Sequence, residues 1–236
     1  MIALARPLSR PIGGAARNDG LEAAKWIALA LMTMNHALIG QQEPLRTIGY
    51  IAGRPCIAVF ASLLTLRLAQ VPEGGAARAA KRLLIFGVIA EPVYLALVWR
   101  LQLRLDILFG LAAGVALIGL IRARRPAAAA ALAVALIPVG AFIEGGCLTP
   151  LAMAAGAWAE RRRKGAGVLL ITLACAGAAL LEAPDLPLSA AAVLAAPLMI
   201  AASRRLPAAP RLPGWAFYAY YPAHLALIWV VLGAYS

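Results

Sequence analysis

The chain has 236 residues, of which 63% are hydrophobic, and its mean hydropathy is +0.84. A soluble domain of this size has too little interior to hide so much apolar surface, so the composition excludes that class and predicts a polytopic membrane protein. The formal net charge is +12, with 22 Lys and Arg residues against 10 Asp and Glu residues. Because the basic residues form short clusters between apolar runs, we attribute this charge to membrane topology and not to nucleic-acid binding.

Apolar runs separated by Arg, Gly and Pro predict an all-α bundle of about nine transmembrane helices. We place the helices at residues 21–40, 55–71, 81–99, 104–121, 127–143, 147–160, 165–181, 188–203 and 214–235. Residues 1–20 hold three arginines and no continuous apolar core, so we expect a cytoplasmic tail there and no cleavable signal peptide. Residues 21–236 are predicted to form a single membrane domain.

The charges between the predicted helices test this topology independently. Most basic residues lie in the N-terminal tail and in alternate connections, at 67–82, 122–125, 161–164 and 204–211. The opposite connections hold only Arg46, Arg54, Arg100 and Arg104. By the positive-inside rule, the N-terminus is cytoplasmic and the C-terminus lies on the outer side.

The first predicted helix, LEAAKWIALALMTMNHALIG, carries a polar dipeptide in its outer third, Asn35-His36. A histidine inside a span usually faces the protein interior or a wet cavity, so this dipeptide is the first candidate for a functional site. Lys25, Met32 and His36 share one face of this helix. The alternative interpretation is that His36 only holds two helices together by a hydrogen bond.

The second histidine, His224, lies about midway along the last predicted helix, in AFYAYYPAHLALIWVV. Tyr221 and His224 share one helical face, and Pro222 cannot donate a hydrogen bond to the carbonyl of Tyr218. This leaves a free acceptor and predicts a kink. The alternative is an aromatic belt at the membrane interface. The sequence does not fix whether His36 and His224 meet.

Three carboxylates accompany the histidines, namely Glu91, Asp106 and Glu144. Glu91 lies within a predicted helix and needs a partner there, for which Arg54 and Arg82 are candidates. The alternative for Asp106 is a helix-start residue, and that for Glu144 is a solvated turn residue. Histidine bases, orienting carboxylates and a basic cytoplasmic rim suit acyl transfer from a phosphate-rich donor. The same residues suit a proton-coupled transporter.

No metal site is expected, because Cys56, Cys147 and Cys175 form neither a CxxC motif nor a zinc spacing. We interpret these cysteines as buried small apolar residues.

Several stretches resemble a known family in their order and spacing. They are DGLEAAKWIALALMTMNHALIG, IGYIAGRPCIAVFASLLTLRLA, KRLLIFGVIAEPVY, LDILFGLAAGVAL and FYAYYPAHLALI. Together they resemble the TraX family of conjugative pilin acetylases, in the TrbP-like branch of P-type conjugation systems. The resemblance implies a plasmid-conjugation protein of the bacterial inner membrane that matures the pilin subunit. It further implies acetylation of the pilin N-terminus with acetyl-CoA as the donor.

The resemblance also implies roles for individual residues. His36 corresponds to the base at the acceptor amine, although Asn35 precedes it where the family usually has Asp. His224, in the intact Tyr221-Pro222-x-His224 motif, positions or relays the acetyl group, and Arg54 holds a carbonyl or carboxylate. The remaining residues assigned to substrate binding are Glu91, Asp106, Glu144 and Tyr221.

Two other functions stay open at this stage. One is pilin processing, cyclisation or chaperoning without acetylation, and the other is proton-coupled transport. The expected partners are the pilin subunit and membrane lipids, with no nucleic acid.

Overall fold

The computed structural model describes residues 20–72, 74–98, 104–183, 185–206, 209–210 and 213–233. The predicted tail, apart from Gly20, lies outside the described residues. Within them the regular structure is helical, and the only extended pairing is an isolated bridge between Leu105 and Ile143. The predicted all-α fold is confirmed.

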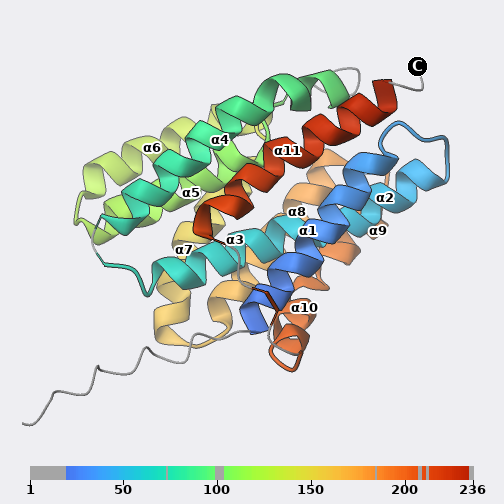
Figure 1. The fold of residues 1–236 in the computed structure, drawn as a ribbon. Helices are drawn as coiled ribbons and strands as arrows, with labels where there is room; N and C mark the ends of the chain where they lie inside the picture. The colour runs from blue at the N-terminus through green and yellow to red at the C-terminus, as the bar shows by residue number, and fades with distance from the viewer. Residues whose placement is uncertain are drawn as a thin grey trace, which may run out of the picture.

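The helices follow one another with short connections (Figure 1). Their bounds are α1 Gly20–Leu38, α2 Leu45–Gly53, α3 Pro55–Leu68, α4 Gly75–Val98, α5 Ile107–Arg122, α6 Pro126–Val139, the 3₁₀ helix η1 Gly140–Phe142, α7 Leu148–Arg162, α8 Ala166–Glu182, α9 Pro187–Val193, α10 Ala196–Ser203 and α11 Gly214–Gly233. Each predicted transmembrane stretch overlaps one of these helices or a consecutive pair of them.

The second helix begins about ten residues earlier than predicted, at Leu45. Arg46 and Thr47 in its first part interrupt the apolar run on which the prediction was based. Helices α2 and α3 form one helical run, Leu45–Leu68. Arg54 at their junction keeps helical backbone angles, and Pro55 occupies the first position of α3, where a missing N–H is tolerated. The helix therefore continues through the junction, so Tyr50 and Arg54 lie on one continuous helix.

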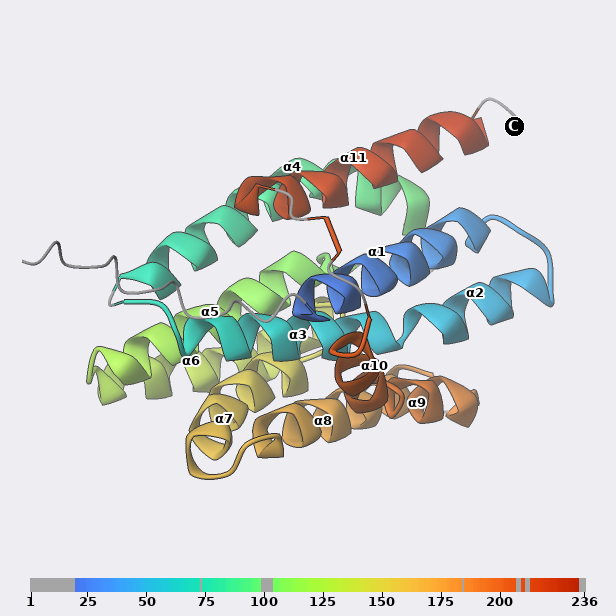
Figure 2. The ribbon, with the colours of Figure 1, turned by 60° about the horizontal axis from the view of Figure 1, so that its bottom comes forward.

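Helix α3 is the centre of the bundle. Its buried side chains include Val59 and Leu63, and it contacts α1, α5, α7, α8, α9 and α10. Figure 2 shows α4 and α11 together on one edge and α7, α8 and α9 on the opposite edge, with α1, α3 and α5 between them. This arrangement brings α1 against α11, although the two helices lie at opposite ends of the chain.

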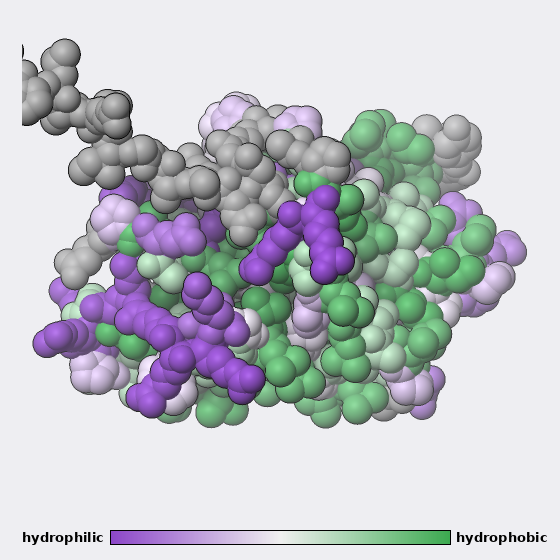
Figure 3. Space-filling model, turned by 90° about the horizontal axis from the view of Figure 1, so that it is seen from below, coloured by the Kyte–Doolittle hydropathy of each residue, from purple (hydrophilic) through white to green (hydrophobic). Residues whose placement is uncertain are grey.

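The outer surface of the bundle is strongly apolar. Val88, Val134, Leu181, Leu198 and Leu227 have exposed fractions between 63% and 77%. Hydrophilic residues gather toward the left of Figure 3, and apolar residues cover most of the rest of that face. Two helical runs, 45–68 and 214–233, are long and apolar enough to cross a bilayer. These features indicate a membrane-associated protein.

Candidate functional site

The two histidines meet. Nδ1 of His36 on α1 lies 2.9 Å from Nε2 of His224 on α11, and both residues are only 5% exposed. A second contact fixes the same pair of helices, since Tyr220 Oη lies 2.7 Å from Thr33 Oγ1. The Thr33 hydroxyl donates to the carbonyl of Leu29, so the Tyr220 hydroxyl is the donor in this contact.

The hydrogen bonds around the histidine pair fix its protons. His224 Nδ1 lies 2.9 Å from the carbonyl oxygen of Tyr220, which can only accept, so Nδ1 carries the proton. In neutral His224, Nε2 is therefore the acceptor, and His36 Nδ1 must donate to it. The lone pair of His36 is left on Nε2, which makes no hydrogen bond with any described residue. The pair thus presents one oriented basic nitrogen.

The carbonyl that orients His224 belongs to the same helix, α11. The carbonyl that binds His224 is that of Tyr220 and not the Tyr218 carbonyl opposite Pro222. The bond follows from helix geometry, because residues four apart lie one above the other on a helix.

Asn35, which precedes His36 on α1, packs against the backbone of α2. A Cβ atom at Gly53 would lie 2.6 Å from Asn35 Cβ, so only glycine permits this close approach.

A buried ion-pair cluster lies beside the histidines. Arg54 Nη1 is 2.9 Å from Glu182 Oε2, and Arg104 Nη1 is 2.8 Å from Glu182 Oε1. The amide N–H of Gly145 also donates to Glu182 at 2.9 Å, and the Arg54 guanidinium stacks 3.9 Å from the ring of Tyr50. Sequence reasoning missed Glu182, Arg104 and Tyr50. The available signal was that Glu182 ends an apolar stretch on the predicted outer side, where Arg54 and Arg104 also lie.

The predicted ion pair of Glu91 with Arg54 or Arg82 is wrong. Glu91 Oε2 instead accepts the backbone N–H of Asp106 at 3.1 Å, and no ion pair among the described residues includes Glu91. Arg54 lies elsewhere because Glu182 holds it. Glu91 therefore contacts the start of α5 and lines none of the cavities described below.

Asp106 and Glu144 each have defined partners. Asp106 caps α5, with Oδ1 accepting the Leu108 N–H at 2.7 Å, so the helix-start interpretation is confirmed for one of its oxygens. Glu144 precedes a turn in which Gly145 and Gly146 have positive φ angles of 81° and 62°. It is not simply solvated, because the Tyr94 hydroxyl lies 3.3 Å from its Oε2.

Three cavities adjoin around this centre. The large cavity, about 360 Å³, is lined by residues that include His36, Glu43, Arg54, Arg104, Glu144 and Glu182. The small cavity, about 30 Å³, shares Asn35, His36, Arg54 and Glu144 with the large one. The apolar cavity, about 170 Å³, shares Met32, Phe60, Ile107 and Tyr221 with the small one. His36 therefore lies where a polar cavity and an apolar cavity approach each other.

The two larger cavities lie toward opposite ends of α1. Lys25 and Met32 line the apolar cavity, and His36 lines the large one, so the predicted common face of α1 follows the path between them. Lys25 and Arg67 both pair with Glu22 at the end of α1 where the chain enters the bundle. At the other end, hydrogen bonds from Thr47 and Arg46 hold the pKa of Glu43, in the α1–α2 connection, below its usual value.

Tyr221, the remaining residue predicted for the site, contacts both histidines. Its ring contacts His36 and His224 edge-on, at centroid distances of 6.2 and 5.5 Å. Its hydroxyl is buried and has no hydrogen-bond partner. The structure therefore brings His36, Asn35, Arg54, Glu144 and Tyr221 together around the small cavity, with His224 bound to His36. Glu91 and Asp106 do not line this cavity.

Comparison with known proteins gives one match. The family model described as TraX protein matches residues 20–232. No curated protein and no solved structure matches the chain. The family match covers nearly all of the sequence, including both histidines, and it confirms the resemblance found in the motifs. The chain belongs to the TraX family, which implies a function connected with conjugation and with the pilin subunit.

Proposed function

We propose that this protein is a multi-pass acetyltransferase of the bacterial inner membrane that acetylates the N-terminal amine of a conjugative pilin. The observation that carries the proposal is the oriented histidine pair, with the free Nε2 of His36 at the junction of two cavities. An amine nucleophile needs a base of this kind, because the ammonium form cannot attack a carbonyl carbon.

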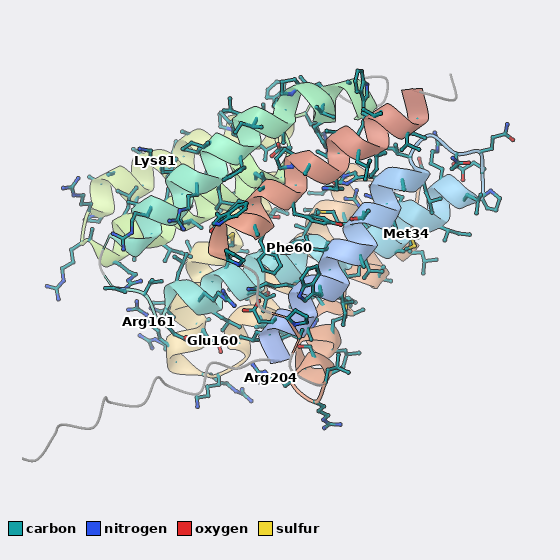
Figure 4. All side chains as sticks on the ribbon, in the orientation of Figure 1. Met34, Phe60, Lys81, Glu160, Arg161 and Arg204 are labelled. Carbon is teal, nitrogen blue, oxygen red and sulfur yellow. The ribbon has the colours of Figure 1, made fainter. Side chains whose placement is uncertain are left out.

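The nine helical stretches support nine membrane spans with a cytoplasmic N-terminus. Figure 4 labels three basic residues near helix ends: Lys81 near the beginning of α4, Arg161 near the end of α7 and Arg204 just after α10. By the positive-inside rule these helix ends lie on the cytoplasmic side. With this orientation the apolar cavity faces the cytoplasmic side. The large cavity faces outward, because its lining comes from the α1–α2, η1–α7 and α8–α9 connections.

The apolar cavity fits the donor, for which we propose acetyl-CoA. Its lining is mostly aliphatic and aromatic, and the basic residues Lys25 and Arg67 line it as well. An uncharged thioester arm suits such a lining, whereas the phosphates of the donor suit the arginines of the cytoplasmic rim. The donor supplies the activated acetyl group. Phe60, labelled in Figure 4, lies at the junction of the apolar and small cavities and defines where this arm ends.

The large cavity fits the acceptor. Glu144 and Glu43 provide negative charge for an incoming ammonium group, and His36 Nε2 takes its proton. His224 holds the imidazole of His36 in the required tautomer, as an orienting residue does in other histidine-based sites. Arg54 lies close enough to the small cavity to bind the acyl oxygen through the guanidinium N–H groups that Glu182 does not occupy.

The intact mass of the cognate pilin tests this function. In cells that carry the gene, the mature pilin is expected to be heavier by one acetyl group than in cells that lack it, with the modification on the N-terminal residue. An unchanged mass would overturn acetylation. Pilin that accumulates with an unprocessed or uncyclised terminus in the deletion strain would instead support the non-acetylating processing role.

A further inference from the structure

Glu144 differs from the two other carboxylates that line the large cavity. Glu43 forms an ion pair with Arg46, and Glu182 forms ion pairs with two arginines. In the described part of the chain, Glu144 forms no ion pair. The Tyr94 hydroxyl, 3.3 Å from Oε2, is its hydrogen-bond partner there, and Oε1 is left without one. The large cavity thus contains a carboxylate whose charge is not compensated by a cation of its own.

The backbone that carries Glu144 is held by contacts on both sides. The N–H of Glu144 donates to the carbonyl of Leu105 at 2.9 Å, within the isolated bridge that pairs Leu105 with Ile143. The next N–H, that of Gly145, donates to Glu182 Oε1, also at 2.9 Å. The side chain therefore projects from a fixed backbone, so little conformational freedom remains to be lost when a ligand binds.

An arginine lies on the chain segment beside this carboxylate. Arg104 directly precedes Leu105, and its Nη1 binds the same Oε1 of Glu182 that accepts the Gly145 N–H. Because Glu182 faces two arginines, this cluster carries one positive charge in excess, and Glu144 carries one negative charge. A guanidinium group has five N–H donors, and Glu182 is contacted by only one nitrogen of Arg104. The wall of the cavity thus offers a carboxylate and, beside it, donors that Glu182 does not occupy.

The N-terminus of a peptide complements this arrangement. Its ammonium group is separated by a single carbon from the first carbonyl, so it presents a cation and a hydrogen-bond acceptor close together. The side-chain amine of a lysine has no carbonyl at that distance. A peptide terminus in the large cavity also lies beside the proposed base, since His36, Arg104 and Glu144 all line it.

The charge of Glu144 separates the substrate of acetylation from its product. Burial outweighs the nearby arginines and raises the pKa of the Glu144 carboxyl group, which lies in the η1–α7 connection. An ammonium group that enters the cavity supplies the missing cation and stabilises the charged carboxylate, in a charge-assisted hydrogen bond. An acetylated terminus is an uncharged amide and makes no such contact. The product therefore binds more weakly than the substrate.

We propose that Glu144 binds the ammonium group of an unmodified peptide N-terminus and that Arg104 binds its first carbonyl, so that the large cavity selects peptide α-amines and releases the acetylated product. The inference rests on the proposed function, from which it takes the acceptor role of this cavity. Glu43 contributes less to this selection, because Arg46 already neutralises its charge.

Peptide binding to the full-length protein in lipid nanodiscs, without any donor, tests the role of Glu144. The probes are a synthetic peptide with the first residues of the cognate pilin, the same peptide acetylated at its N-terminus, and the same peptide with hydrogen in place of the amine. We expect wild type to bind the free-amine peptide about tenfold more tightly than either of the others, the usual contribution of a hydrogen bond between charged groups. Glu144→Gln is expected to bind all three about equally.

Glu160→Gln is the matched control. Glu160, labelled in Figure 4, lies near the opposite end of α7 and accepts the backbone N–H groups of Gly165 and Gly167. Gln retains an acceptor for these groups, as it does for the Tyr94 hydroxyl in Glu144→Gln, so both variants are expected to fold. The control should keep the preference for the free-amine peptide.

A fourth probe tests the role of Arg104. It is an acetylated peptide with lysine at its first position, which offers only a side-chain amine. Wild type is expected to bind it several-fold more weakly than the free-amine peptide. Arg104→Met should lose this difference and keep the preference for a charged over an uncharged terminus, which depends on Glu144. A general loosening of the cavity would reduce both preferences together.

The outcomes separate this proposal from the proposed function. The role of Glu144 would be overturned by equal binding of charged and uncharged termini to wild type, by no measurable binding of the free-amine peptide, or by a preference that survives Glu144→Gln. Equal binding of the α-amine and side-chain amine probes to wild type, or a difference that survives Arg104→Met, would overturn the role of Arg104. The expected binding with pilin that is never acetylated would overturn the proposed function alone, and acetylated pilin without the expected binding would overturn the recognition alone.

Discussion

Replacing His36 by Ala is expected to slow pilin acetylation by a factor of about 100 or more, the usual contribution of a general base. The reason is that His36 Nε2 is the lone pair left free by the Tyr220–His224–His36 hydrogen bonds. His224→Ala is expected to have a smaller effect, because it removes the orientation of the imidazole and not the imidazole itself. The measurement is the initial rate of transfer to pilin by purified variants in lipid vesicles.

Met34→Ala is the matched control for the His36 variant. Met34 lies on the same helix, is 36% exposed and points away from the site, so its removal should leave the rate unchanged (Figure 4). A His36→Ala protein that melts like wild type and acetylates pilin at the wild-type rate would contradict the assignment of the base.

Replacing Glu182 by Gln is expected to lower the free energy of unfolding by about 3 kcal/mol, the typical cost of removing one partner from a buried ion pair. The change leaves Arg54 and Arg104 without their shared anion. Arg54→Met should cost less, because it leaves the pair of Glu182 with Arg104 intact. Thermal unfolding in detergent micelles measures both effects.

Glu43→Gln serves as the control for this series. It breaks the Glu43–Arg46 ion pair, in which both side chains are about half exposed, and exposed pairs contribute little to stability. Its melting temperature should match that of wild type. Equal melting temperatures for Glu182→Gln and wild type would show that the buried cluster does not stabilise the bundle.

The helices were predictable because the signal for an apolar helix is local, namely a continuous apolar run in the sequence. Apolar runs and their separating Arg, Gly and Pro residues place each stretch within a few residues. The largest difference is at the start of the 45–68 helix, where polar residues of α2 line the large cavity and interrupt the apolar pattern. Helix α4 also begins earlier than predicted, at Gly75. The interior position of the two histidines was also predictable, since a histidine within an apolar helix usually faces the protein interior or a wet cavity.

The partners of the polar residues were not predictable in the same way. Glu182 and Arg54 are separated by 128 positions, and no local pattern states which carboxylate an arginine meets. Glu91 was assigned an arginine because charge alone favours such a pair, whereas the packing of α4 on α5 gives it a backbone N–H. The direction of the His36–His224 bond depends on the contact between His224 and the Tyr220 carbonyl, which the sequence analysis did not predict.

Sidedness of the transfer tests the central claim most directly, namely that His36 connects a cytoplasmic donor cavity with an outward acceptor cavity. The experiment uses sealed vesicles with the protein in one orientation, acetyl-CoA confined to the side of the N-terminus, and pilin supplied on the other side. We predict acetylated pilin with the wild-type protein and none with His36→Ala. Acetylation only when donor and acceptor share one compartment would contradict the account.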